Sequence, residues 1–203
     1  MRKIIGLAGF IGSGKGTVGG YLVNQHGYHA ISFADSLKTA VSVVFGWPRD
    51  LLEGSTTESR TWRELPDDYW SKKMGDLVTP RWVLQYVGTD VFRNNFHKDI
   101  WLWSLERRIS SSDGPVVITD VRFPNEIEMV TQLGGEVWWI RRDPEPSWVG
   151  DAINGLDMPS LHPSVHSSEH EWVALASSTA RSMQNNGTLE DLHAEIERAL
   201  GEP

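Results

Sequence analysis

Residues 4–17 read IIGLAGFIGSGKGT, and this stretch decides the fold. The apolar run from Ile4 to Ala8 has the pattern of a buried parallel strand. Gly9 ends that run, more glycines follow, and Lys15 stands between two of them. A strand, a glycine-rich turn and a helix that begins near Lys15 predict a phosphate-binding loop, because glycines let successive N–H groups point inward. The helix N-terminus and the lysine ammonium add positive charge at the same place.

The loop predicts a nucleoside triphosphate as its ligand. Lys15 can reach the β- and γ-phosphates, and the Thr17 hydroxyl can bind phosphate or Mg²⁺. The alternative is a glycine-rich turn without a ligand. The strict pattern places Ser or Thr directly after the lysine, whereas Gly16 stands there and Thr17 follows it. The displaced threonine resembles the GxxGxGKGT form found in nucleoside-monophosphate kinases such as adenylate kinase.

Composition restricts the class of protein. The chain has 203 residues, which predicts one domain with room for an inserted subdomain. It has no cysteine, which excludes disulfides and thiolate zinc sites. A formal charge of −8 argues against a general nucleic-acid-binding surface. No signal peptide or membrane-spanning run is evident, so a cytoplasmic protein without a membrane partner is expected.

Strand and helix patterns alternate along the chain. Strands are predicted at 29–33, 115–120, 136–140 and 180–185, and helices at 15–25, 34–46, 124–135 and 188–200. Residues 47–80 predict an irregular, partly helical insert, residues 80–110 two helices broken near Asn94, and residues 141–179 a mobile loop or lid. This order predicts an α/β fold with a parallel sheet, in which ligands bind at the carboxyl ends of the strands.

Polar clusters follow the predicted strands. Asp120 ends an apolar run, as does the acid that holds Mg²⁺ beside a phosphate-binding loop; the alternative is a helix N-cap. Arg122 lies on the same side of this extended segment and suits phosphate, the alternative being a salt bridge to Glu126 or Asp120. Arg141 and Arg142 follow the next strand, where one of them can act on the transferring phosphoryl group and the other can be a solvated charge.

Several longer segments together resemble one family. They are FADSLK (33–38), RWVLQYVGTDVFRNNFHKDIW (81–101), VVITDVRFPNE (116–126), HSSE (166–169) and NNGTLEDL (185–192). With the phosphate-binding loop, they resemble the bacteriophage deoxynucleoside monophosphate kinases over nearly the whole chain. The resemblance implies a three-layer P-loop kinase fold with an acceptor-binding insert at about 46–110 and a lid at about 141–179.

The resemblance also implies a reaction and its residues. The reaction would transfer the γ-phosphate of ATP to a deoxynucleoside monophosphate, with Mg²⁺. The expected catalytic residues are Lys15, Asp120, Arg122, Arg141 and Arg142, with Thr17 and Asp120 at the metal. ATP would be bound by Gly12, Ser13, Gly14, Lys15, Gly16 and Thr17, with Asn185 and Gly187 near the adenine. The acceptor would be bound by Lys38, Arg81, Gln85, Gly88, Thr89, Trp101, Arg122, Glu126, His166 and Glu169.

Some of these residues could instead have purely structural roles. Gly88 can serve the approach of a ligand or of a second helix, and segment 81–95 alone fits helix packing as well as a substrate site. His166 can contact phosphate or cap a turn, and with His162 and His170 nearby a metal site is conceivable but disfavoured. The oligomeric state stays open, although a homodimer is compatible with the tryptophan-rich insert.

Two other functions fit the same pattern. A P-loop kinase of another small phosphorylated acceptor, such as dephospho-coenzyme A, would share this layout. A nucleotide-dependent switch would hydrolyse ATP slowly and act through a partner. The arginines gathered on the acceptor side favour a kinase.

Overall fold

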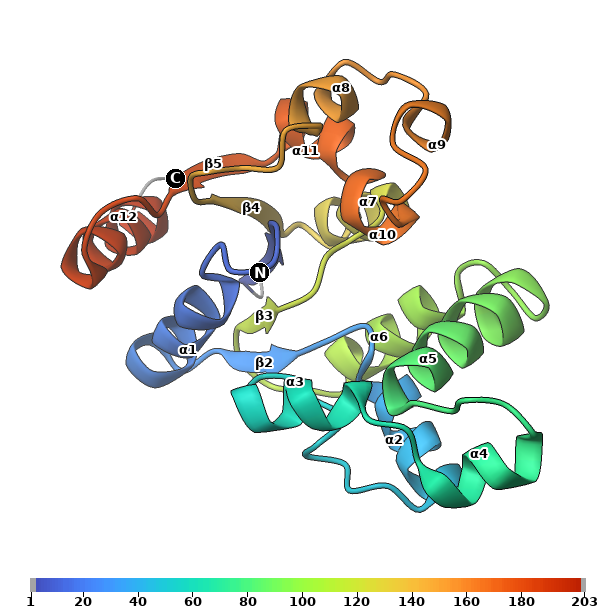
Figure 1. The fold of residues 1–203 in the computed structure, drawn as a ribbon. Coiled ribbons are helices and arrows are strands. Elements are labelled where there is room, and N and C mark those ends of the chain that lie inside the picture. The colour runs from blue at the N-terminus through green and yellow to red at the C-terminus, as the bar shows by residue number, and fades with distance from the viewer. Residues whose placement is uncertain (1–2, 202–203) are drawn as a thin grey trace. The chain divides into compact units, whose positions relative to one another are not determined.

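The computed structural model describes residues 3–201. The chain divides into two compact units, one formed by the residues up to Ser32 together with those from Ser111, the other by Phe33–Ser110. The first unit contains the strands of the described chain, and the second is helical (Figure 1). No helix within residues 3–201 is long and apolar enough to cross a membrane.

The first unit is built on a parallel five-stranded sheet in the order β2-β3-β1-β4-β5. The strands are β1 (Ile4–Ala8), β2 (His29–Ile31), β3 (Val116–Ile118), β4 (Glu136–Arg141) and β5 (Arg181–Gln184). Central strand β1 places Ile5 opposite Val117 on one side and Glu136 on the other. Because the strands run the same way, the loops that follow them emerge at one edge of the sheet. The predicted strands are confirmed, with β2 and β3 shorter than expected.

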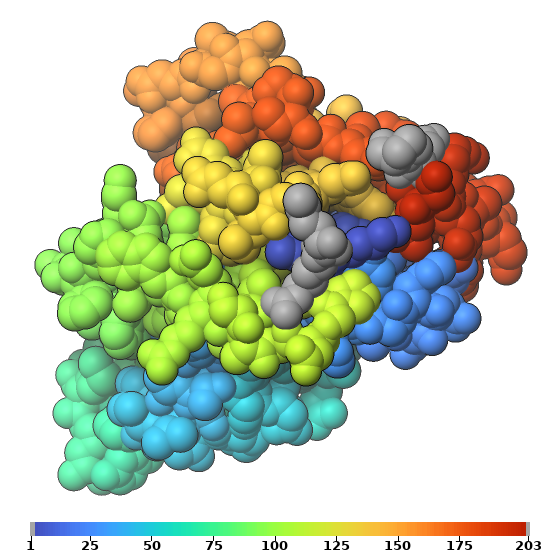
Figure 2. Space-filling view, turned by 180° about the vertical axis from the view of Figure 1, so that it is seen from behind, coloured from blue at the N-terminus to red at the C-terminus, as the bar shows by residue number. Residues whose placement is uncertain are grey.

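Helices cover both faces of this sheet. Ile5 and Leu7 lie in one buried cluster with apolar residues of α1 (Lys15–His26) and α12 (Leu189–Gly201). Gly6 faces the opposite side, where a Cβ would lie 3.2 Å from Val130 Cγ2 of α7 (Pro124–Gln132). Helix α11 (Val173–Thr179) contacts α7 and β4, and the surfaces of α7 and α11 adjoin in Figure 2. The predicted α/β fold with a parallel sheet is confirmed.

The expectation of a loop over residues 141–179 is wrong in one respect, because much of this segment is helical. It contains α8 (Val149–Ile153), α9 (Met158–Leu161), α10 (Ser167–His170) and α11. Val173 and Ala176 of α11 are buried, so this end of the segment belongs to the core. The sequence did not reveal the helices because each spans only one or two turns, too short for a periodic pattern. A lid role for the segment stays a prediction.

The second unit contains five α-helices and one π-helix. They are α2 (Asp35–Phe45), α3 (Thr57–Glu64), α4 (Asp68–Met74), α5 (Pro80–Gln85), η1 (Tyr86–Asn94) and α6 (Ile100–Ser110). The partly helical insert and the break near Asn94 are confirmed. The π-helix was not predicted: η1 continues α5 with wider turns, which changes which side chains share a face.

Two kinds of helix terminus are capped by local contacts. Gly27 and Gly46 end α1 and α2 with positive φ angles of 66° and 72°. Thr188 caps α12, because its Oγ1 accepts a hydrogen bond from the backbone N–H of Asp191 at 3.2 Å. The Asp191 carboxylate accepts in return from the backbone N–H of Thr188 at 2.8 Å.

Candidate functional site

The loop between β1 and α1 has the backbone of a phosphate cradle. Gly12 and Gly14 have φ angles of +81° and +106°, which side-chain-bearing residues rarely adopt. A Cβ on Gly14 would also lie only 2.2 Å from the Asn185 amide nitrogen. Ser13 is buried, and its hydroxyl has no hydrogen-bond partner among the described residues. A buried, unpartnered hydroxyl beside inward-curving glycines fits an anionic ligand.

Lys15 is folded back onto this loop. Its ammonium donates to the carbonyl oxygens of Gly9 at 2.5 Å and Phe10 at 2.9 Å. Burial, and next the nearby Arg122 cation, lower the pKa of Lys15 to about 8, while Glu169 and Asp120 oppose this shift. A phosphate would take the place of the two carbonyls and hold the lysine in its charged form.

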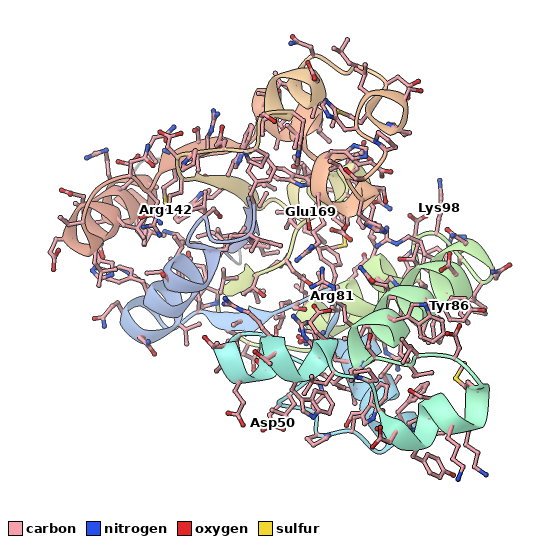
Figure 3. The ribbon with its side chains drawn as sticks, viewed as in Figure 1. Asp50, Arg81, Tyr86, Lys98, Arg142 and Glu169 are labelled. Carbon is pink, nitrogen blue, oxygen red and sulfur yellow. The ribbon has the colours of Figure 1, made fainter. Side chains whose placement is uncertain are left out.

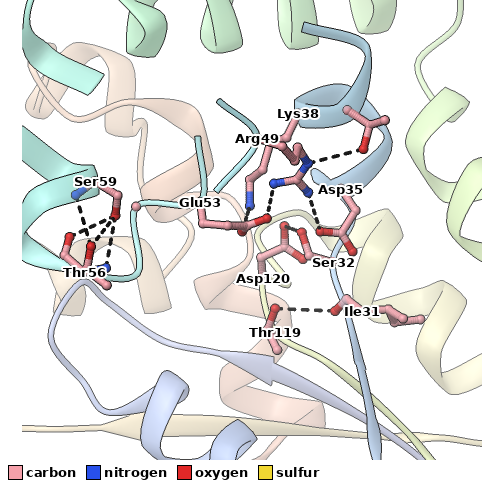
Figure 4. Close-up of polar contacts among 12 residues, drawn as sticks. Ile31, Ser32, Asp35, Lys38, Arg49, Glu53, Thr56, Ser59, Thr119 and Asp120 are labelled. Atoms are coloured by element: carbon pink, nitrogen blue, oxygen red, sulfur yellow. Dashed lines mark hydrogen bonds and ion pairs between the residues drawn. The ribbon is translucent and has the colours of Figure 1, made fainter. Parts of the chain in front are cut away.

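Asp120 lies just past β3, the strand beside β1. The N–H of Val121 donates to the Leu7 carbonyl at 3.2 Å, which holds this segment along the central strand. The carboxylate of Asp120 accepts from the Ser32 hydroxyl at 2.9 Å (Figure 4). Thr17 is exposed in the first turn of α1. Carboxylate and hydroxyl oxygens are the donors that Mg²⁺ prefers, so this donor set fits the ion.

The described residues contain no group of three or more His, Cys, Asp or Glu side chains that could hold a metal ion. A Mg²⁺ ion in a phosphotransferase commonly has one or two protein carboxylates and takes its other ligands from phosphates and water. A single carboxylate at Asp120 is therefore compatible with that kind of site.

The ion-pair partner of Arg122 is Glu169 rather than Glu126 or Asp120. The Arg122 guanidinium lies 3.6 Å from a carboxylate oxygen of Glu169 on α10. The N–H groups of Arg122 and Phe123 instead donate to Glu126, at 2.7 and 3.2 Å.

Glu126, predicted for the acceptor site, is engaged by backbone N–H groups, and its role at the acceptor stays a prediction. This side chain is only 2% exposed, and its carboxylate accepts backbone hydrogen bonds at the start of α7. It therefore fixes the Arg122 main chain and caps the helix.

Arg141 and Arg142 differ although they are neighbours. Arg141 pairs through two nitrogens with Glu145, including an Nε–Oε1 contact of 2.9 Å, and lies 4.5 Å from the ring centre of Trp139. The hydrogen bond to Glu145 raises the pKa of Arg141. Arg142 is exposed and forms no ion pair within the described part of the chain. Of the two, Arg142 is the one available to a ligand.

A cavity of about 510 Å³ joins these elements. It is lined by residues 10–13 of the loop, residues 142–146 after β4, and Glu169 of α10. Figure 3 labels Arg142 and Glu169, which come from parts of the sequence far from the loop. The loops after β1 and β4 thus share one space with Glu169 of α10.

Asn185 and Gly187, the predicted adenine contacts, have structural roles within the chain, and contact with adenine stays a prediction. The Asn185 side-chain amide donates to the Ser13 carbonyl at 2.8 Å, so it supports the phosphate-binding loop. A Cβ on Gly187 would lie 2.5 Å from Asp191 Oδ2, so glycine leaves room for the α12 cap. His166 likewise caps α10, where its Nδ1 accepts from the Ser168 N–H at 3.2 Å. The turn-capping alternative for His166 is the one observed.

The predicted acceptor residues of the second unit are largely occupied by internal contacts. Lys38 donates to Glu53 at 2.7 Å, and Arg49 pairs with Glu53 and, at 3.3 Å, with Asp35 (Figure 4). Burial alone would raise the pKa of Glu53, but the hydrogen bonds from Lys38 and Arg49 lower it overall.

The remaining predicted acceptor residues lie on α5, η1 and α6. Arg81 is exposed and pairs with Glu64 at 2.9 Å. Gln85 is exposed and Thr89 half-buried. Figure 3 labels Arg81 together with Tyr86, which begins η1.

Gly88 and Trp101 pack within the second unit, and their role at the acceptor stays a prediction. A Cβ on Gly88 would lie 2.6 Å from a methyl carbon of Leu37, so the glycine serves the approach of a second helix. The buried Trp101 indole N–H donates to the Gly88 carbonyl at 2.9 Å. Both residues therefore hold η1 against its neighbours.

With this geometry established, comparison with known proteins identifies the family. The family model for deoxynucleotide monophosphate kinase matches residues 53–154. The chain is 33% identical to the "Putative deoxynucleotide monophosphate kinase" of Acanthamoeba polyphaga mimivirus, over 95% of this chain and 93% of the relative. The chain belongs to the deoxynucleotide monophosphate kinase family.

A second member is similar over a shorter stretch. The deoxynucleoside-5'-monophosphate kinase of Escherichia phage T5 is 50% identical over 57 residues, 28% of this chain and 23% of that protein. Among solved structures, the dephospho-CoA kinase from Campylobacter jejuni overlaps with a TM-score of 0.46 at 14% identity, covering 98% of this chain and 96% of that one.

Three residues of this kinase-family site were not predicted. Ser32 donates to Asp120, Glu145 holds Arg141, and Phe10 accepts from Lys15. A serine inside a predicted strand and a glutamate four residues after an arginine are weak signals. The role of Phe10 had no sequence signal, because it arises from a main-chain carbonyl.

Proposed function

We propose that this member of the deoxynucleotide monophosphate kinase family transfers the γ-phosphate of ATP to a deoxynucleoside monophosphate and releases the diphosphate. One observation carries the proposal: Lys15, Arg122 and Arg142 lie around or beside the cavity formed by the phosphate-binding loop. Asp120 and Glu169 offset two of these three positive charges. Asp143 also lines the cavity, so carboxylates balance these cations in the free protein, and Mg²⁺ would supply further positive charge for the phosphates of two substrates.

In this proposal the residues bind and align rather than exchange protons. The acceptor phosphate is already an anion, so no strong general base is needed. Lys15 leaves the carbonyls of Gly9 and Phe10 for the phosphates of ATP, while the loop N–H groups hold the chain of phosphates. Arg122 and Arg142 neutralise the charge that spreads over the moving phosphoryl group.

Thr17 and Asp120 are proposed to hold Mg²⁺ together with the phosphates of ATP. When bound, the ion would neutralise phosphate charge and orient the γ-phosphate. The Ser32 hydroxyl fixes the Asp120 carboxylate by its hydrogen bond, which limits the carboxylate's rotation.

The proposal also gives roles to residues of the second unit and to the segment 141–179. Lys38, Arg81, Gln85 and Thr89 are proposed to take part in recognition of the acceptor, as members of a helical acceptor-binding insert. The segment 141–179 is proposed to exclude water during transfer, which would suppress ATP hydrolysis. A homodimer and a cytoplasmic location are proposed on the family resemblance.

An acceptor panel tests the function directly. Labelled ATP and Mg²⁺ are supplied with each of the four deoxynucleoside monophosphates, the matching ribonucleotides and dephospho-coenzyme A. We expect labelled deoxynucleoside diphosphate from at least one acceptor, and no transfer by a folded Lys15→Ala variant. Transfer only to dephospho-coenzyme A, slow hydrolysis without any acceptor product, or near-normal turnover by Lys15→Ala would contradict the proposal.

A further inference from the structure

Phe10 stands in the phosphate-binding loop, yet its side chain lies in an aromatic cluster. The ring is only 8% exposed. Its centre lies 5.3 Å from those of Trp148 and Trp172, and 6.4 Å from that of Trp139. Trp139 and Trp172 also meet edge to face at 5.3 Å. We call these four residues the aromatic cluster; such edge and tilted contacts stabilise beyond the apolar area they bury.

The main-chain carbonyl of Phe10 holds two groups of the phosphate-binding loop by hydrogen bonds. The Phe10 carbonyl accepts from the Lys15 ammonium at 2.9 Å and from the Ser13 N–H at 3.2 Å. A shift of the Phe10 ring would move this carbonyl and, with it, both the lysine and the loop N–H group. The position of the ring and the geometry of the loop are therefore linked.

The tryptophans of the cluster come from three separate elements. Trp139 lies on β4, Trp148 is the N-cap residue of α8, and Trp172 is the N-cap residue of α11. The Arg141 guanidinium lies over the Trp139 ring and is held by Glu145. Phe10 thus joins the loop to β4 and to the starts of two helices in the segment 141–179.

We infer that Phe10 is a positioning residue for ATP: its ring, fixed by the tryptophans, sets the carbonyl that accepts from the Ser13 N–H to shape the loop and that holds Lys15 beside the loop until ATP binds. The inference rests on the proposed function, because it assumes that the loop binds ATP. It predicts that a tryptophan outside the phosphate-binding loop influences ATP affinity through Phe10. Ordinary core packing would predict only a loss of stability when either ring is replaced.

Two leucine substitutions and one control separate these outcomes. Phe10→Leu and Trp148→Leu each remove a ring of the cluster while keeping the site apolar. Trp148 is only partly buried, so its variant is the milder one should Phe10→Leu fold poorly. The control is Phe45→Leu in the second unit. The ring centre of Phe45 lies 4.6 Å from that of Trp47 and 4.8 Å from that of Trp70. The Phe45 carbonyl accepts from the Trp70 indole of the same unit.

Calorimetry with Mg²⁺ and a non-hydrolysable ATP analogue measures affinity, and urea unfolding measures stability. We expect each cluster variant to weaken affinity about tenfold, which corresponds to about 1.4 kcal/mol. The double variant should lose little more than either single variant, because both act through one contact. Phe45→Leu should lose stability but keep the wild-type affinity.

Three results would overturn the inference. In the first, Phe10→Leu lowers only the free energy of unfolding, as the control does. In the second, the two single effects on affinity multiply in the double variant, which shows that they are independent. In the third, the wild-type protein binds no ATP analogue, which overturns the proposed function as well. Binding of the analogue without phosphorylation of any deoxynucleotide would contradict the proposed function alone, since the affinity comparison would still stand.

Discussion

The guanidinium of Arg141 is held by the carboxylate of Glu145, with Nε 2.9 Å from Oε1 and a second contact through the other oxygen. Glu145 is four residues further along, in the loop that leaves β4. A paired arginine on a tryptophan face is a structural element rather than a free cation. The adjacent arginine, which lines the cavity, is therefore the better candidate for contact with phosphate.

Replacing Arg142 should change mainly the rate, whereas replacing Arg141 should change mainly the stability. Arg142→Ala should lower kcat about 100-fold or more, because a guanidinium on the transferring phosphoryl group stabilises the transition state. Arg141→Ala should instead lower the free energy of unfolding by about 1–2 kcal/mol, since Glu145 loses its partner. Steady-state kinetics and urea unfolding of both variants measure the difference. A larger kinetic defect in Arg141→Ala would contradict the assignment.

The pKa of Lys15 predicts a limit on activity at alkaline pH. The ammonium must be charged to bind phosphate, and its pKa in the free protein is about 8. The kcat/KM for ATP should therefore fall as pH rises above about 8, whereas kcat should fall later because bound phosphates favour the charged lysine. Lys15→Arg should remove this limb from whatever activity remains, since arginine stays protonated. A flat wild-type profile up to pH 10 would exclude the assignment.

Asp120→Asn tests the proposed magnesium site. The substitution keeps the size of the side chain but removes its charge, so the Mg²⁺ concentration for half-maximal rate should rise about tenfold or more. A titration of rate against Mg²⁺ at saturating ATP measures this. Asp113→Asn, at an exposed aspartate that precedes β3, is the matched control and should leave the titration unchanged. Equal curves for wild type and Asp120→Asn would remove Asp120 from the metal site.

Glu126→Ala separates a capping role from a substrate role. The backbone N–H groups of Arg122 and Phe123 would lose their acceptor, so the free energy of unfolding should fall by about 2–3 kcal/mol. Glu128→Ala, at an exposed position of the same helix, should change stability by less than about 0.5 kcal/mol. Urea unfolding compares the two. A raised KM for the acceptor with unchanged stability would instead support direct contact with substrate.

Asn185→Ala asks whether this amide recognises the adenine or supports the loop. Loss of the hydrogen bond to the Ser13 carbonyl should raise KM about three- to tenfold for ATP and for GTP alike. A contact with the base would change the ratio of the two values, because adenine and guanine differ in their hydrogen-bonding edges. Initial rates with both donors supply that ratio. Unequal effects would support the predicted adenine contact.

Whether the sequence could predict a structural feature depends on how far apart along the chain the interacting residues lie. The strand, glycine turn and helix of residues 4–26 follow from local preferences: an apolar run, glycines that allow positive φ, and a helix start at Lys15. The place of Asp120 follows from the apolar run before it. Family resemblance named the correct family for the same reason, because it compares segments one after another.

The sequence could not predict which distant side chains meet. Arg122 meets Glu169, Asn185 meets Ser13, and Gly88 meets Leu37 across long stretches of chain. Periodicity describes which face a residue occupies, but it holds no information about which distant segment covers that face. The π-helix and the one-turn helices of the segment 141–179 escaped for a related reason, since packing rather than intrinsic preference stabilises them.

The sequence by itself therefore determined the phosphate-binding loop, the parallel sheet and the family. Only the tertiary structure decided which charged residues remain available: it engaged Arg141 and Glu126 internally and left Arg142 at the cavity. It also placed Phe10 among tryptophans from three other elements. The physical reason is that backbone conformation follows mainly from neighbours in sequence, whereas hydrogen bonds, ion pairs and ring contacts depend on distances between segments that only folding brings together.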